Sequence, residues 1–274
     1  LEWAASRNHD SVVALLRRSD PARSDTRDVE LVRAVQTRDL ARTRELLAAG
    51  ANPNTRTSTG GSLVSFAVYV QNVELTRALL EAGADWRVRE RHEIPLVQAA
   101  AQRGNLDIVR LLLSAGAPAR VPGTATSAAA SGRVEMLRLV DSAGADVRES
   151  NDEPLRGAAS AGSVEVVRYL LGRGAVADAP DAHGRTALSR AVAFRQHEVV
   201  RVLLGAGASA RQQSPGTGWT PLMSAAMAGD TLMVRILMDA GANPAVRDGE
   251  GKTAADYARG AGQHHVIPIL ERRR

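Results

Sequence analysis

The chain has no cysteine, few aromatic residues and a single lysine, Lys252, among its 35 basic residues. The lack of cysteine excludes disulfides, thiolate metal ligands and cysteine nucleophiles. No apolar run reaches the roughly 18 residues that a membrane-spanning helix needs, so we expect no such helix. Aromatics make up 3% of the 274 residues, so alanine, leucine and valine have to carry the core. Cores of such small side chains favour closely stacked helices.

Patterns typical of catalysis are also missing. The six histidines form no HExxH spacing and no histidine–carboxylate cluster with the spacing of metal ligands. The glycine pairs at 205–207 and 260–262 lack the preceding strand that a phosphate-binding loop requires. No pair of carboxylates can be nominated for acid–base work. We therefore predict a protein that is not an enzyme, with no cofactor, no metal and no small-molecule substrate.

A Gly-Ala pair that recurs seven times organises the chain. Successive pairs are separated by 33, 33, 28, 30, 33 and 34 residues. A period near 33 residues is typical of stacked repeat proteins, whose units pack only on their neighbours. Such arrays present long surfaces, which favours binding over catalysis. The glycines are Gly50, Gly83, Gly116, Gly144, Gly174, Gly207 and Gly241.

One repeat, residues 153–174, indicates the local structure. Its sequence is EPLRGAASAGSVEVVRYLLGRG. Pro154 fits the first turn of a short helix with a small apolar face, and Gly162 fits the left-handed residue that ends it. A second helix follows, with a valine pair and a leucine pair at helical spacing. Neither helix buries its apolar stripe alone, so we expect helix pairs that stack on similar neighbours.

The pattern returns elsewhere, as in TPLMSAAMAGDTLMVRILMDAGA (220–242), TALSRAVAFRQHEVVRVLLGAGA (186–208) and LVQAAAQRGNLDIVRLLLSAGA (96–117). These segments resemble the ankyrin repeat, with its threonine-proline-leucine start, double alanine, glycine, valine pair, leucine run and glycine-alanine end. The resemblance covers nearly the whole chain. It implies an all-α solenoid of stacked antiparallel helix pairs with short β-hairpin loops, here called fingers. We predict one array over residues 1–274, with repeats at 1–20 (partial), 21–51, 52–84, 85–117, 118–145, 146–175, 176–208, 209–242 and 243–274 (a cap).

Several positions depart from the family pattern. The finger after Ala117 is missing, the finger at 148–152 is shortened, and the finger at 212–219 is slightly enlarged. Residues 1–20 match a repeat without its start, and no Met precedes them. We expect a fragment or a processed product, and its compartment (cytoplasmic, periplasmic or secreted) stays open. The family's histidine after the leucine is replaced by Val97, Arg156, Ser189, Met223 and Asp256.

The net charge of +5 raises the question of a nucleic-acid partner. Seven arginines, however, recur at one position of the second helix, and five of them have an acid three residues earlier. Such pairs are ordinary surface support, worth roughly 0.2–0.5 kcal/mol each, so we expect a solvated back face and no nucleic-acid partner. The strong preference for arginine over lysine is typical of a GC-rich coding sequence, and we interpret the source as bacterial. The seven are Arg44, Arg77, Arg110, Arg138, Arg168, Arg201 and Arg235.

The resemblance implies a protein partner on the concave face, which is built from finger tips and the exposed ends of the first helices. Three of the few aromatics, Tyr69, Phe194 and Trp219, fall on these positions. Large aromatics are frequent binding hot spots, although packing against neighbouring helices is an equally good interpretation of each. The predicted contact residues are Tyr69, Arg91, His92, Gln102, Arg103, Glu149, Asp152, His183, Arg185, Phe194, Trp219, Met227 and Lys252.

The missing finger after Ala117 separates two kinds of charge. We hypothesise that a basic edge before it and an acidic edge after it suit a polar protein partner. The basic residues are Arg87, Arg89, Arg91 and Arg103, and the acidic ones are Glu149, Asp152, Asp178 and Asp181.

We predict a non-catalytic scaffold, monomeric on its own, that holds or inhibits one protein partner. An inhibitor or immunity protein is a special case of this prediction. Two alternatives stay open. In the first, the chain is the recognition arm of a larger effector or enzyme. In the second, it binds nucleic acid electrostatically, and log affinity then falls linearly with log salt concentration.

Overall fold

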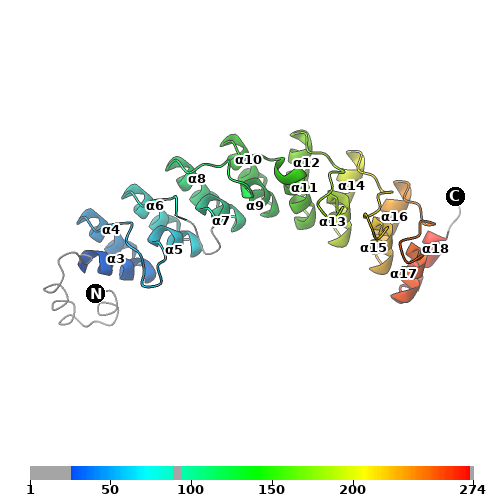
Figure 1. Ribbon diagram of the computed structural model, residues 1–274, viewed down its shortest axis with the longest axis horizontal. Coiled ribbons are helices and arrows are strands. Elements are labelled where there is room, and N and C mark those ends of the chain that lie inside the picture. Colours follow the sequence, from blue (N-terminus) through cyan, green and yellow to red (C-terminus); the bar gives the residue numbers. More distant parts are fainter. Residues whose placement is uncertain (1–25, 89–93, 272–274) are drawn as a thin grey trace. The chain divides into compact units, whose positions relative to one another are not determined.

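The computed structural model describes residues 26–88 and 94–271, which form helices, turns and an antiparallel bridge between Arg56 and Ser62. The contacts divide the chain into two compact units, unit 1 up to Thr124 and unit 2 from Ala125. Each unit is a row of short helices (Figure 1). The predicted all-α stack of helix pairs is confirmed. The predicted partial repeat 1–20 lies outside the described residues.

In unit 1, each first helix packs against the second helix of its own pair, and the first helices of the first two pairs also pack against the first helix of the next pair. The pairs are α3 (Thr26–Gln36) with α4 (Leu40–Ala48), α5 (Leu63–Tyr69) with α6 (Val73–Glu81), and α7 (Leu96–Gln102) with α8 (Leu106–Ser114).

Unit 2 follows the same scheme in its second, third and fourth pairs, and its α9 begins at the last residue of unit 1. Its pairs are α9 (Thr124–Ala130) with α10 (Val134–Ser142), α11 (Glu149–Ala161) with α12 (Val164–Gly172), α13 (Ala187–Ala193) with α14 (His197–Gly205), α15 (Pro221–Met227) with α16 (Thr231–Asp239), and α17 (Ala254–Gly260) with η1 (His264–Val266) and α18 (Ile267–Leu270).

The core is built from small aliphatic side chains. In α8, Ile108, Val109 and Leu112 are fully buried, as the valine and leucine positions of the repeat predict. Burying one such side chain stabilises the fold by about 1.5–3 kcal/mol. Every aromatic side chain in the described ranges is at least partly exposed. Within those ranges, no helix combines the length and the hydrophobicity needed to cross a bilayer.

Caps at both ends keep the helices short. Thr186 begins α13 with a capping box, in which its side chain accepts from Ser189 N and Ser189 Oγ accepts from Thr186 N. Gly174 follows the last residues of α12 with φ of +87°, in the left-handed region where glycine carries no steric penalty. All seven glycines of the Gly-Ala pairs share this conformation, with φ between +86° and +93°.

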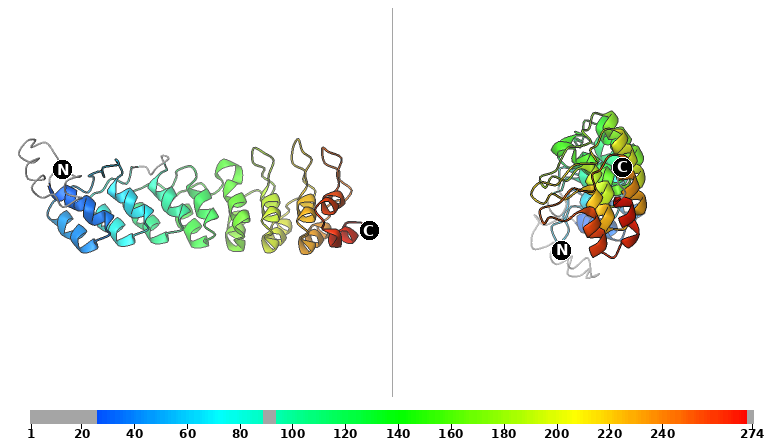
Figure 2. Two further views of the ribbon diagram at one scale, coloured as in Figure 1. Left: turned by 90° about the horizontal axis from the view of Figure 1, so that it is seen from below. Right: turned by 90° about the vertical axis from the view of Figure 1, so that its right-hand side faces the viewer.

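The fingers of unit 2 are tight turns. Figure 2 shows the loops before α13, α15 and α17 projecting from the same edge of the row. One finger is closed by a hydrogen bond from Asp181 N to Arg185 O (2.9 Å), and the next by one from Ser214 N to Trp219 O (2.8 Å). The last two fingers are joined to each other, because Gly249 N donates to Thr217 O at 2.8 Å.

Candidate functional site

Three of the first helices, one in unit 1 and two in unit 2, carry an exposed large apolar side chain at or next to their C-terminal end. In unit 1 this side chain is Tyr69, the last residue of α5, which is 64% exposed. The Arg103 guanidinium lies over its ring, 5.1 Å from the centroid, and also donates to Ala99 O at 3.1 Å. Gln102, at the end of α7, is exposed. The predicted residues Tyr69, Gln102 and Arg103 thus occupy neighbouring helix ends.

In unit 2 the corresponding positions hold Phe194 and Met227, which are 56% and 45% exposed. Phe194 follows α13 and Met227 ends α15. Arg195, next to Phe194, has a left-handed backbone and donates to Ala228 O at 2.9 Å. This contact ties the end of α13 to the end of α15. Two apolar side chains and one cation therefore share this part of the surface.

Trp219 is held in place by neighbours within unit 2. Its Nε1 donates to Ser224 Oγ at 2.6 Å, and its ring meets the Tyr257 ring edge-on with centroids 4.5 Å apart. The Lys252 ammonium lies 5.6 Å from the Tyr257 centroid and pairs with Glu250 at 2.7 Å. These contacts favour the alternative in which Trp219 supports its own finger.

The same cluster fixes the ionisation of Tyr257. Its hydroxyl donates to the Asp248 carboxylate, and this hydrogen bond is the largest cause that raises the pKa of Tyr257 to about 12. The same bond lowers the pKa of Asp248. The contribution of Tyr257 to stability is therefore present below its unfolded pKa of about 10 and is lost as the pH rises towards 12.

We expect Asp248→Asn to move the pKa of Tyr257 back towards about 10, because the amide carries no charge that favours the protonated phenol. Tyrosinate absorbance measured against pH follows this change. Asp141→Asn is the matched control, since Asp141 accepts from Tyr169 in a similar way. If the tyrosinate titration step at the highest pH is the same in Asp248→Asn as in the native chain, the Tyr257–Asp248 bond does not set this pKa.

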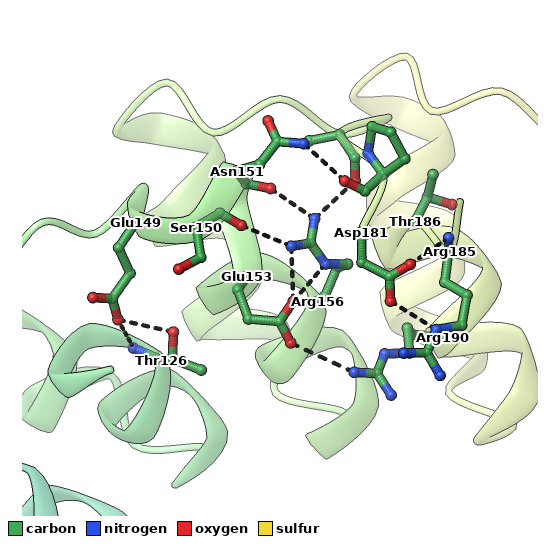
Figure 3. Close-up of polar contacts among 12 residues, drawn as sticks. Thr126, Glu149, Ser150, Asn151, Glu153, Arg156, Asp181, Arg185, Thr186 and Arg190 are labelled. Carbon is green, nitrogen blue, oxygen red and sulfur yellow. Dashed lines mark hydrogen bonds and ion pairs between the residues drawn. The ribbon is translucent and has the colours of Figure 1, made fainter. Parts of the chain in front are cut away.

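The predicted shortened finger at 148–152 is a left-handed turn. Ser150, Asn151 and Asp152 have φ of 51°, 57° and 62°, and the right-handed part of α11 follows. A left-handed L-residue costs roughly 1–2 kcal/mol, so three in a row need support from elsewhere in the fold. Figure 3 shows this turn folded over the Arg156 guanidinium.

Arg156 supplies much of that support. The residue is 2% exposed, and its guanidinium donates to Asn151 O at 2.7 Å and to Ser150 O at 3.0 Å. It also donates to Ala179 O at 3.0 Å and forms an ion pair with Glu153 at 2.7 Å. Arg156 stands at the family's histidine position, and the sequence alone does not indicate its role. Its hydrogen-bond acceptors lie up to six residues earlier in the chain, at Ser150, and 23 residues later, at Ala179. No periodic sequence pattern predicts contacts at these separations.

Two of the predicted contact residues belong to this turn. Asp152 was expected at the surface, but it is 2% exposed and accepts from Val176 N at 3.1 Å and Arg148 Nε at 3.3 Å. The prediction for Asp152 is therefore wrong, because the left-handed turn directs this carboxylate inward. Glu149 is half-buried and accepts from both Thr126 N and Thr126 Oγ1 at 2.8 Å. Its carboxylate is thus partly engaged within the fold.

The other predicted residues are distributed over the fingers. Arg185 pairs with Asp181 at 2.7 Å, and His183 is exposed at the same turn. Partial burial alone would raise the pKa of Asp181, but hydrogen bonds from Arg185 and His183 lower it to about 2. Arg91 and His92 lie outside the described residues. The hypothesis of a basic and an acidic edge concerns both units and stays a prediction.

The arginine column of the second helices is exposed apart from the half-buried Arg77. Only two of the five predicted pairs along one helix form within the described ranges, Arg77 with Glu74 at 3.8 Å and Arg201 with Glu198. Arg138 instead lies over the Tyr169 ring, 5.6 Å from its centroid. The surface is therefore less neutralised by contact than the sequence predicts.

A groove of about 650 Å³ lies near the end of unit 2, beside α17 and α18. Three arginines line it, and each already has a partner. Arg211 donates to Gly241 O at 2.8 Å, Arg247 to Gly251 O at 2.6 Å, and Arg259 pairs with Asp256 at 2.9 Å. In the part of the chain that the structure describes, no three His, Asp or Glu side chains are grouped as metal ligands would be.

A family model described as ankyrin repeats in three copies matches residues 31–122, 125–214 and 206–272. The chain belongs to the ankyrin-repeat family. Ankyrin repeats are generally protein–protein interaction domains, and the matched residues consist of such repeats.

Known ankyrin-repeat proteins match parts of the chain. An ankyrin repeat-containing protein of Treponema pallidum (strain Nichols) is 37% identical over 109 residues, 40% of this chain and 37% of that protein. A protein named as E3 ubiquitin-protein ligase XBAT34 of Arabidopsis thaliana is 35% identical over 125 residues, 45% of this chain and 33% of that protein. Tyrosine-protein kinase HTK16 of Hydra vulgaris is 31% identical over 115 residues, 42% of this chain and 15% of that protein. The chain thus spans about a third or less of the length of most of these relatives.

Proposed function

We propose that this ankyrin array binds a protein partner through the C-terminal ends of its first helices. One observation supports this most directly. Five large apolar side chains are exposed in residues 26–88 and 94–271, and three of them occupy these helix ends. They are Tyr69 in unit 1, and Phe194 and Met227 in unit 2. Covering apolar surface contributes roughly 25 cal/mol per Å², and a few such anchors commonly carry most of the binding energy. Gln102 and Arg103, which are exposed and half-exposed, are polar residues at the end of the next first helix of unit 1.

The proposal is tested with a triple variant, Tyr69→Ser, Phe194→Ser and Met227→Ser. We expect the native chain to capture a protein from the source lysate at high salt and the variant to lose it, because all three anchors are removed. Quantitative mass spectrometry of the captured material measures the loss.

The other two exposed apolar residues provide a matched control. Val176 follows α12 and is 51% exposed, and Leu232 lies near the start of α16 and is 46% exposed. Val176→Ser with Leu232→Ser should keep the capture. Loss in this control together with retention in the triple variant would move the site to the second helices and their loops. Capture of nucleic acid that disappears at high salt would support the electrostatic alternative.

We keep a second candidate, in which the chain is the recognition arm of a longer protein. The relatives favour it, since the chain covers 37%, 33% and 15% of the three described above. Immunoblotting of the source cell with an antibody against this chain measures the mass of the whole protein. A mass near 29.0 kDa supports a stand-alone binder, whereas a much larger mass supports the arm. We also propose that the array has nine helix pairs and that binding inhibits the partner. If the captured partner is an enzyme, its activity with and without the chain tests inhibition.

A further inference from the structure

We propose that the helix ends of unit 2 bind an acidic peptide segment that carries an apolar side chain. Arg190 and Arg195 would receive the carboxylates, and Phe194 and Met227 would receive the apolar group. This inference rests on the proposed function, because it gives the chemistry of the partner for one part of the same surface.

Arg190 shares its acid with another cation. Its guanidinium lies 3.5 Å from Glu153, whose carboxylate is also paired with the buried Arg156 at 2.7 Å (Figure 3). One carboxylate thus faces two guanidinium groups and leaves one positive charge in excess. Arg190 Nε is buried and has no hydrogen-bond acceptor among the described residues. Although Nε itself is buried, the Arg190 side chain as a whole is 26% exposed, so a partner group can reach its exposed part.

Arg190 and Phe194 are one helical turn apart. Phe194 N donates to Arg190 O at 3.0 Å, which closes the last turn of α13. Residues at this separation lie on the same side of a helix. Arg195 follows directly, and its guanidinium makes no ion pair within residues 26–88 and 94–271, although one of its nitrogens donates to Ala228 O. A cation therefore lies on each side of Phe194 along the chain.

The acids closest in the fold to this surface are already engaged. Asp230 lies 2.8 Å from His197 Nε2 and also accepts from Met233 N. Asp181 is engaged by Arg185. Asp181 is therefore not available to balance Arg190 or Arg195. Burial raises and the bond with His197 lowers the pKa of Asp230, and the charge of Arg195 helps to lower it, so Arg195 is partly balanced by this carboxylate. The surface combines the shared cation of Arg190 and the partly balanced cation of Arg195 with two exposed apolar side chains. Arginine binds carboxylates with two parallel hydrogen bonds, and complementary charge favours an acidic partner over a basic one.

The test selects ligands for the full chain from a library of random linear peptides displayed on phage. We expect the selected peptides to combine Asp or Glu with Leu, Phe or Trp. For a selected peptide, Arg190→Met should weaken binding by roughly tenfold or more, because a charge-assisted hydrogen bond is lost while most of the side-chain volume is kept. Exchanging the peptide's Glu for Gln should weaken binding to the native chain by a similar factor, and binding to Arg190→Met by much less.

Arg168→Met is the matched control. Arg168 is exposed on α12 and makes no ion pair in the described part of the chain, so this variant should bind like the native chain. Selected peptides without acidic enrichment, or equal effects of Arg190→Met and Arg168→Met, would overturn the inference. The proposed function is tested separately, because it fails if the triple variant Tyr69→Ser, Phe194→Ser and Met227→Ser leaves partner capture unchanged.

Discussion

Replacing Arg156 by Met is expected to lower the free energy of unfolding by about 3–5 kcal/mol, the range found when one partner of a buried ion pair is removed. The reason lies in the number of groups left without a donor. The carbonyl groups of Ser150, Asn151 and Ala179 all accept from this guanidinium, and Glu153 forms an ion pair with it. Methionine fills part of the volume but donates no hydrogen bond. The left-handed turn then loses the contacts that offset its conformational cost.

The loss is measured by urea unfolding followed by circular dichroism. Hydrogen exchange shows which part of the chain loses stability. This is needed because repeat arrays can unfold in parts, and a single unfolding midpoint then has no clear meaning. We expect faster exchange in α11 and α13, the helices on either side of the Arg156 contacts. Arg156→Lys should recover only part of the stability, because an ammonium cannot reach four acceptors arranged around a planar guanidinium.

Arg168→Met is again the control, and its stability should remain within about 0.5 kcal/mol of the native value, as is usual for surface changes. If Arg156→Met costs no more than Arg168→Met, the left-handed turn is stabilised by other contacts. The first candidates would then be Asn151 Nδ2, which donates to Pro180 O at 2.7 Å, and the buried Asp152.

Features that depend on local sequence could be predicted well. Pro154 was expected in the first turn of a helix, and it lies at the start of the right-handed part of α11. Gly162 was expected to end that helix, and it does so with φ of +77°. Each of these features depends on neighbours within four residues, which is the range that periodicity and capping rules describe.

Features that depend on contacts between repeats could not be predicted. Asp152 looked like a finger-tip acid, because the sequence does not show that three left-handed residues turn its carboxylate towards Val176. Arg156 looked like a departure from the family pattern, because its acceptors include Ala179 in the next repeat. A buried arginine also contradicts the usual exposure of this residue type. Such exceptions arise where tertiary hydrogen bonds override local preference.

The candidate surface falls between these two cases. Tyr69, Phe194 and Met227 were predicted from their register in the repeat, and the structure exposes all three. Register predicts that a side chain points outward, since the helix fixes its direction. It does not predict whether a neighbour covers that side chain, and Trp219 shows the difference. Its aromatic partner, Tyr257, lies in the cap repeat, 38 residues further along the chain.

Trp219→Ala is therefore expected to lower stability by about 2–3 kcal/mol, somewhat less than the 3–5 kcal/mol of a fully buried aromatic. The variant loses the edge-on contact with Tyr257 and the hydrogen bond to Ser224. It also loosens the link between the last two fingers, where Gly249 N donates to Thr217 O. Hydrogen exchange of residues 214–219 and 248–252 should increase, and urea unfolding measures the total loss.

Two further variants separate support from binding. Trp219→Phe keeps an aromatic ring against Tyr257 and loses the indole donor, so it should recover more than half of the stability. Trp86→Ala removes a half-buried tryptophan of unit 1, over which the Arg87 guanidinium lies 4.6 Å from the ring centroid. It should leave exchange in the last two fingers unchanged. If Trp219→Ala keeps native stability but loses the protein partner, Trp219 is a binding anchor, and the supporting role assigned to it here is wrong.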